Sequence, residues 1–123
     1  MRKGINAERE LFHLLENKGF FVIRAAGSGH LKSPDLLAFK LGTYIGFEVK
    51  AHNKKELRFS REQLDNMEKW EKNTGIALYI AWKVPKKGFL FLPTKYINKN
   101  DGAKTVSIKL DEAYKLAYKE WEL

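Results

Sequence analysis

The first stretch with a clear pattern of apolar and polar positions runs from Ile5 to Lys18. Its apolar residues recur at helical spacing and Gly19 follows it, so the pattern predicts a helix that ends at this glycine. Glu8 falls on the same predicted face as Leu11 and Leu15. A carboxylate on such a face needs a partner if it is buried, which makes Glu8 a candidate functional residue. The alternative is an acid placed near the helix N-terminus because the helix dipole favours negative charge there.

Short runs bounded by glycine and proline predict the next elements. Residues 19–24 indicate a strand, and residues 27–34, with two glycines and a proline, indicate a loop. Leu36 to Phe39 and Thr43 to Lys50 then predict two strands joined by a turn around Gly42. The early part of the chain is therefore expected to contain a β-hairpin.

A second helix is predicted to begin at Ser60. Ser60 and Gln63 have the form of a capping box, in which each residue satisfies a backbone N–H group of the other, and Gly75 ends the helical pattern. One stripe of this predicted helix consists of Gln63, Met67, Trp70 and Thr74.

The second half of the chain predicts two strands, Ile76 to Trp82 and Gly88 to Leu92, which are apolar on both sides. In the second of them two phenylalanines alternate with two leucines. Whichever pair leaves the core must be covered by the last helix or by a second subunit, and the pattern leaves both open. A weaker strand from Thr105 to Lys109 and a helix from Asp111 to Trp121 follow. The inward face expected for this helix is Tyr114, Ala117, Tyr118 and Trp121, as core rather than as a base-stacking surface.

This order of elements predicts one α/β domain over residues 1–123, with a mixed central β-sheet flanked by helices. The 44% hydrophobic and 13% aromatic residues indicate a packed core. No cysteine is present, so an ion would be held by oxygen atoms or by the three histidines, which favours Mg²⁺ or Mn²⁺ over Zn²⁺. No run approaches the ~18 apolar residues that span a bilayer, and we expect a cytoplasmic protein without a membrane partner.

The formal net charge is +8, from 23 Lys and Arg against 15 Asp and Glu. A charge of this size favours a polyanionic partner such as DNA, because basic side chains attract phosphates and release their counterions. The alternative is a charge that only maintains solubility. The segment from Ser60 to Trp82 is slightly acidic, so the positive excess lies in the first sixty residues and in the lysine-rich last third.

The predicted hairpin brings acidic residues together. Asp35 opens its first strand and Glu48 lies near the end of the second, so strand pairing places the two carboxylates side by side. Lys50 lies on the same face of the strand as Glu48. Paired carboxylates repel each other unless a cation neutralises them, and hard oxygen ligands suit Mg²⁺ at a phosphate. The alternative is an exposed strand face that carries a surface ion pair.

Four segments of the chain carry a resemblance to a known family: Arg2 to Leu11 (RKGINAEREL), Gly19 to Ser28 (GFFVIRAAGS), Pro34-Asp35, and Glu48-Val49-Lys50. These segments resemble the archaeal Holliday junction resolvases of the Hjc type, which belong to the PD-(D/E)xK nuclease superfamily. The likeness is close over the first fifty residues and only general beyond Leu64. It implies a restriction-endonuclease-like three-layer fold with a mixed central sheet.

The resemblance also implies roles for individual residues. Glu8, Asp35 and Glu48 would bind Mg²⁺, with Mn²⁺ as a substitute, and Lys50 would assist the attacking water. Contacts to DNA are implied for Arg9 and Arg24 at phosphates and for Ser28 in a loop near the site. The basic residues that would guide the strand further include Arg2, Lys3 and Lys32. Gln63 resembles a glutamine that follows the E-x-K motif in many superfamily members, and it is a candidate accessory residue.

The sequence therefore predicts a Mg²⁺-dependent endodeoxyribonuclease that makes paired symmetric nicks in DNA four-way junctions. Two matched cuts by a domain with one site are made most simply by a two-fold homodimer. We expect no small-molecule cofactor, and a place of action in the cytoplasm of an archaeal cell or of a viral host cell. The alternatives are another nuclease of the superfamily that acts on flaps, nicks or duplex DNA, and a basic DNA-binding protein without catalysis.

Overall fold

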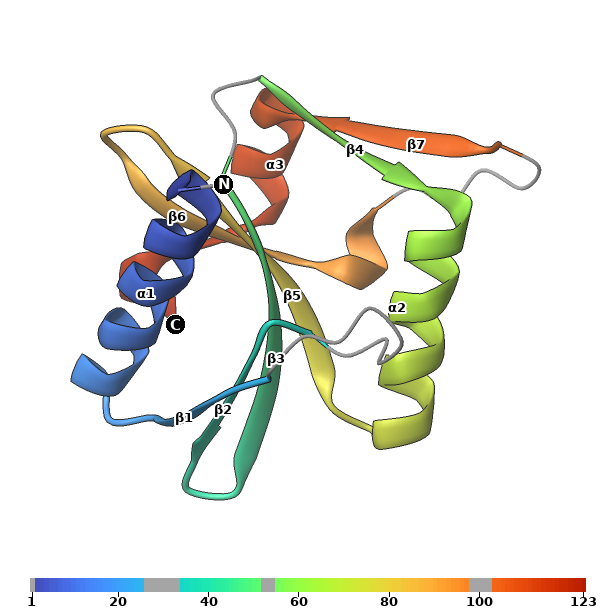
Figure 1. The fold of residues 1–123 in the computed structure, drawn as a ribbon. Helices are drawn as coiled ribbons and strands as arrows, with labels where there is room; N and C mark the ends of the chain where they lie inside the picture. The colour runs from blue at the N-terminus through green and yellow to red at the C-terminus, as the bar shows by residue number, and fades with distance from the viewer. Residues whose placement is uncertain (1, 26–33, 52–54, 98–102) are drawn as a thin grey trace.

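A computed structural model describes residues 2–25, 34–51, 55–97 and 103–123 (Figure 1). Its elements are α1 (Arg2–Asn17), β1 (Phe21–Arg24), β2 (Leu36–Lys40), β3 (Thr43–Lys50), β4 (Glu56–Ser60), α2 (Arg61–Thr74), β5 (Ala77–Val84), β6 (Gly88–Pro93), η1 (Thr94–Tyr96), β7 (Thr105–Lys109), α3 (Leu110–Leu116), β8 (Tyr118–Lys119) and η2 (Glu120–Glu122). None of the helices in these ranges is long and apolar enough to cross a membrane.

Six strands form the central sheet, in the order β1-β2-β3-β5-β6-β8. The β3–β5 pair is parallel and the other pairs are antiparallel, so the sheet is mixed as predicted. β2 and β3 are joined by Leu41 and Gly42, whose φ angles of 49° and 81° are those of a tight hairpin turn. Parallel pairing of β3 with β5 requires a long crossover, and β4 and α2 lie within it.

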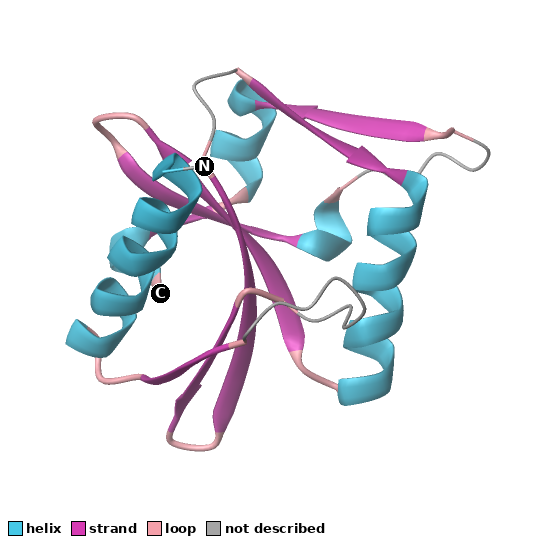
Figure 2. Ribbon diagram, in the orientation of Figure 1, coloured by secondary structure: helices cyan, strands magenta, loops and turns pink. Residues whose placement is uncertain are grey.

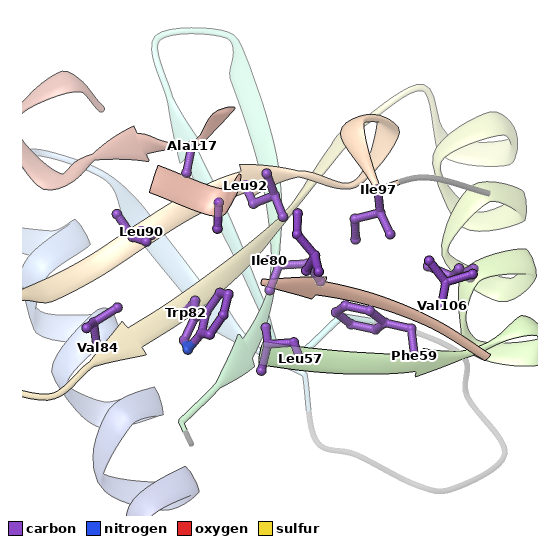
Figure 3. Close-up of a cluster of buried hydrophobic side chains, with 13 residues drawn as sticks. Leu57, Phe59, Ile80, Trp82, Val84, Leu90, Leu92, Ile97, Val106 and Ala117 are labelled. Carbon is purple, nitrogen blue, oxygen red and sulfur yellow. The ribbon is translucent and has the colours of Figure 1, made fainter. Parts of the chain in front are cut away.

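Both faces of the sheet are covered, which gives the molecule three layers (Figure 2). α1 packs on one face, where Leu11 and Leu15 are fully buried with Phe47. The other face carries a second cluster, which includes Leu64 of α2 and Trp82 of β5, together with residues of α3, β4 and β7 (Figure 3). The predicted three-layer α/β fold is therefore confirmed.

The strands β5 and β6 supply residues to both clusters, as their two apolar sides predicted. Phe89 and Phe91 point into the cluster under α1, whereas Leu90 and Leu92 point into the opposite one. All four side chains are buried within one chain. The leucine pair therefore needs no second subunit to cover it.

Two strands, β4 and β8, were not predicted, and β7 lies in a different sheet than expected. β4 was missed, and it pairs with β7 in a separate two-stranded antiparallel sheet. We call this pair the β4–β7 ribbon. Its alternate residues Leu57, Phe59, Val106 and Ile108 are buried in the second cluster. Because β4 and β7 are far apart in the sequence, neither one alone reveals the partner that makes it a strand.

The prediction for the last helix is wrong beyond Leu116. Ala117 is extended at φ −86° and ψ 153°, and β8 after it pairs with the edge of β6. Sheet pairing there satisfies backbone groups of β6 that a longer helix would leave open. Tyr118 and Trp121, expected in the core, are 41% and 79% exposed.

The stripe of four residues predicted for α2 is only partly its packed face. Leu64 is its buried residue, whereas Gln63 and Thr74 are exposed. Met67 does pack against the second cluster, and the ring of Trp70 lies over Gly46 of β3. The helix is thus rotated so that Leu64, next to Gln63, points inward.

Candidate active site

The hairpin register places Asp35 beside the end of β3. Leu36 pairs with Phe47, so Asp35, immediately before β2, lies opposite Glu48. The backbone N–H of Val49 donates a hydrogen bond of 2.8 Å to Oδ2 of Asp35. Both carboxyl groups are only partly exposed. The predicted strand pairing thus places Asp35 next to Glu48, as expected from the sequence.

The electrostatics of the pair show that the two carboxyl groups interact. Burial raises the pKa of Glu48 from 4.5 to about 7, and the charges of Asp35 and Glu8 add to this increase while Lys50 opposes it. Burial also raises the pKa of Asp35, and the hydrogen bond from Val49 is the largest opposing influence. Burial and the neighbouring acids disfavour the charged forms of both carboxyl groups, and a bound cation would stabilise these charged forms.

Glu8 reaches the same region from α1. Its charge raises the pKa of both Asp35 and Glu48, so the three acids form one electrostatic group. Its Oε1 accepts a hydrogen bond of 2.5 Å from Nε of Arg24 on β1. The Glu8 side chain is 21% exposed and that of Arg24 is 62% exposed. The predicted partner for a carboxylate on this helix face is therefore an arginine that remains open to solvent.

Lys50 lies on the Glu48 side of β3. Its Nζ is 3.8 Å from Oε2 of Glu48 and 5.9 Å from the ring centroid of Phe59. The Lys50 side chain is 21% exposed, so the ammonium group is partly enclosed between the carboxylate and the ring. This placement keeps a positive charge next to the acid pair.

A cleft of about 210 Å³ opens beside these groups, lined by Glu8, Arg9, Phe12, Arg24 and Leu36. Two arginines from α1 and β1 thus share a cavity with a carboxylate of the site. Phe12 and Leu36 were not among the predicted site residues. Phe12 could have been found, because it lies one helical turn after Glu8.

Comparison with known proteins identifies the family of this chain. The sequence profile described as "Archaeal holliday junction resolvase (hjc)" matches residues 1–119. The chain is 31% identical over 113 residues to "Crossover junction endodeoxyribonuclease Hjc" of Archaeoglobus fulgidus, an alignment that covers 90% of this chain and 80% of that protein. The chain belongs to the archaeal Holliday junction resolvase family. The resemblance, the nuclease class and the resolvase function predicted from the sequence are thereby confirmed.

Two further comparisons support the assignment. The resolvase is 39% identical over 82 residues to the protein of the same name from Methanocaldococcus jannaschii, across 67% of this chain and 59% of that one. The solved structure of Archaeoglobus fulgidus Hjc superposes with a TM-score of 0.82 at 28% identity, over 95% of this chain and 91% of that chain. The likeness thus extends well beyond the motifs near the N-terminus.

A nuclease family of this kind implies a divalent metal cofactor. Within the described ranges, no three acidic or histidine side chains form a compact metal-binding group. Asp35 and Glu48 nonetheless fit such an ion, because they are adjacent, partly buried oxygen donors whose pKa values are raised. The third candidate ligand, Glu8, has its Oε1 bound by Arg24 in this structure.

The remaining predicted residues have mixed outcomes. Ser28 and Lys32 lie outside the described residues, and for Arg2 and Lys3 only the helical backbone is described. Gln63 is used locally: its Oε1 accepts a 2.9 Å hydrogen bond from the backbone N–H of Ser60 within the capping box. Its accessory role, like the roles assigned to the other site residues, stays a prediction.

Proposed function

We propose that this resolvase hydrolyses phosphodiesters of DNA four-way junctions with Mg²⁺ held by Asp35 and Glu48, and that Mn²⁺ can replace Mg²⁺. The observation that carries the proposal is the adjacency of these two carboxylates beside Lys50 in a chain of this family. When bound, the ion supplies Lewis acidity at the scissile phosphate. Hard oxygen donors and the lack of cysteine favour Mg²⁺ over softer ions.

The protein's own groups have separate tasks. Lys50 holds and orients the attacking water and stabilises the negative charge that develops on the phosphate. Its distance of 3.8 Å from Glu48 keeps both groups on one side of the reacting centre. Arg9 and Arg24, in the adjacent cleft, bind phosphate oxygens of the strand to be cut. Hydrolysis would leave a 5′-phosphate and a 3′-hydroxyl, as the superfamily resemblance implies.

Glu8 is the third metal ligand in this proposal. In the free protein its carboxylate is bound by Arg24, whose guanidinium is largely exposed. A DNA phosphate near the cleft competes for that guanidinium and releases Glu8 toward the acid pair. Substrate binding and completion of the metal site are then coupled, since each favours the same arrangement of Arg24.

We further propose that the active form is a two-fold homodimer. A four-way junction has two equivalent strands to be cut. Glu8, Asp35 and Glu48 together provide one cleavage site per chain, so two chains related by a two-fold axis provide the two sites. Because the substrate is DNA, the protein would act where the genome is, in the cytoplasm of an archaeal cell or of a viral host.

A cleavage assay on a synthetic four-way junction tests the proposal. Asp35→Asn and Lys50→Ala should each lose at least 100-fold in single-turnover cleavage with Mg²⁺, in line with the usual effect of removing one catalytic group. The matched controls are Asp65→Asn and Lys69→Ala, which change the same residue types at exposed positions of α2. Undiminished cleavage by both site variants would refute the assignment. Mapping the two cuts and using a matched linear duplex measures symmetry and junction selectivity in the same experiment.

A further inference from the structure

The turn between β5 and β6 holds a lysine in an unfavourable backbone conformation. The N–H of Lys87 donates a hydrogen bond of 3.0 Å to the carbonyl oxygen of Val84, which closes a four-residue turn. Pro85 occupies its second position, and Lys86, at the third, has φ +65°. These are the features of a type II turn, whose third position favours glycine or asparagine. A lysine there costs stability that glycine would not.

This turn lies at the same end of the sheet as the acid pair. Lys50 pairs with Trp82 across the parallel β3–β5 ladder, and β5 continues for two more residues to Val84. With strands ~4.8 Å apart and ~3.3 Å per residue, the Cα of Val84 lies about 8 Å from that of Lys50. In Figure 1 the turn projects beside the N-terminal end of α1. The helix that carries Glu8 and the turn thus flank the same end of the sheet.

The lysines of this segment differ in their partners. Nζ of Lys83 forms an ion pair of 2.7 Å with Glu10 of α1, so its charge is already matched. Among the described residues, neither Lys86 nor Lys87 forms an ion pair, and both are exposed. Nζ of Lys87 lies 6.0 Å from the ring centroid of Tyr114. The turn therefore presents two positive charges to solvent.

An acid close to the turn, Glu120, is engaged by the backbone of β6. Oε2 of Glu120 accepts a hydrogen bond of 2.8 Å from the backbone N–H of Phe89. Glu120 lies so close to the chain at Gly88, whose φ is +90°, that a Cβ added there would meet its carboxylate. This acid fixes the base of the hairpin and leaves the two lysines at its tip available.

We propose that Lys86 and Lys87 form a phosphate-binding turn for the duplex arm that flanks the cut. The assignment rests on the proposed function, because it takes the acid pair beside Lys50 as the place of cleavage. Each strand of B-DNA carries a phosphate every ~3.4 Å along the helix axis, so the ~8 Å between Lys50 and Val84 correspond to about two to three nucleotides along that strand. Phosphate contacts of this kind set the register of the DNA. This role would account for a charged residue at a backbone position that favours glycine.

The test measures binding of a four-way junction in EDTA, where the DNA stays intact, over a series of salt concentrations. Lys86→Gly and Lys87→Gln should each weaken binding about 3- to 10-fold and reduce the slope of log K against log salt by ~0.9, the value for one lost phosphate contact. Lys72→Gln, at an exposed position of α2, is the matched control and should change neither quantity.

Lys86→Gly provides a second readout that a purely structural lysine would not give. Because glycine suits φ +65°, its melting temperature should rise while its affinity for the junction falls. Slopes equal to that of the Lys72→Gln control, or the same loss in all three variants, would overturn the proposal. A lowered melting temperature of Lys86→Gly would overturn the strain argument. Failure of the proposed function is read separately, as undiminished cleavage by both Asp35→Asn and Lys50→Ala.

Discussion

The raised pKa of Glu48 predicts that the active site costs the metal-free protein stability. The folded-state pKa of about 7 lies above the ordinary value of 4.5, so the folded protein binds this proton more tightly than the unfolded chain. Stability is then greatest below pH 4.5 as far as this group is concerned, and it falls as the pH rises through the window up to about 7. Above this window the folded protein carries the full cost of a charged, partly buried carboxylate.

The size of this cost follows from the same shift. One pKa unit corresponds to about 1.4 kcal/mol, so the change from 4.5 to about 7 corresponds to about 3 kcal/mol at pH 8. The Glu48 side chain is 28% exposed, and screening by solvent lowers this to about 2 kcal/mol. Glu48→Gln keeps the shape of the side chain and removes its charge. It should therefore stabilise the metal-free protein at pH 8 by about 2 kcal/mol, or about 8 °C in melting temperature.

Urea unfolding in EDTA at pH 5 and pH 8 measures this effect. The difference in the free energy of unfolding between Glu48→Gln and the unchanged protein should be large at pH 8 and small at pH 5. Asp65→Asn, which removes an exposed carboxylate of α2, serves as the control and should show little difference at either pH. Added Mg²⁺ should stabilise the unchanged protein more than the variant. A variant that is equally stable or less stable at pH 8 would refute the electrostatic account of the site.

Three other substitutions test separate parts of the structure. Arg24→Gln should tighten binding of Ca²⁺ to the free protein, measured by calorimetry, more than Arg9→Gln does. Both substitutions remove a positive charge from the cleft, but only Arg24→Gln removes the ion-pair partner of Glu8. Equal effects would contradict the proposed coupling. Gln63→Ala should lower the free energy of unfolding in urea by about 1 kcal/mol, because the capping box is lost. A large loss of cleavage by the folded variant would instead support the accessory role. Gly46→Ala should destabilise by about 1–3 kcal/mol, since its Cβ would lie 2.9 Å from the Trp70 ring; unchanged stability would show that the ring moves away freely.

The parts of this protein that the sequence predicted well are those fixed by local pattern. The capping box at Ser60 and the turn at Gly42 are chemical signals within a few residues, and both occur as predicted. The adjacency of Asp35 and Glu48 followed from a single hairpin, in which the register is set by the turn. This pair of acids could therefore be placed without knowledge of the rest of the fold.

The errors occur where a distant partner decides the structure. β4 is a strand because it pairs with β7, and the residues after Leu116 leave the helix because they pair with β6. Helical spacing of aromatic residues near the C-terminus competed with that pairing and gave the wrong result. The link between Glu8 and Arg24 was missed for the same reason, because it joins two elements sixteen positions apart in the sequence.

The β4–β7 ribbon has a consequence for how the protein folds and partly unfolds. Its strands join residues such as Leu57 and Ile108 that are about fifty positions apart, so it can form only after a long segment has been ordered. The ribbon covers one side of the cluster around Trp82 without belonging to the main sheet. We expect it to assemble late and to detach as a cooperative unit before global unfolding, so amide hydrogens of the ribbon should exchange faster than those of β5.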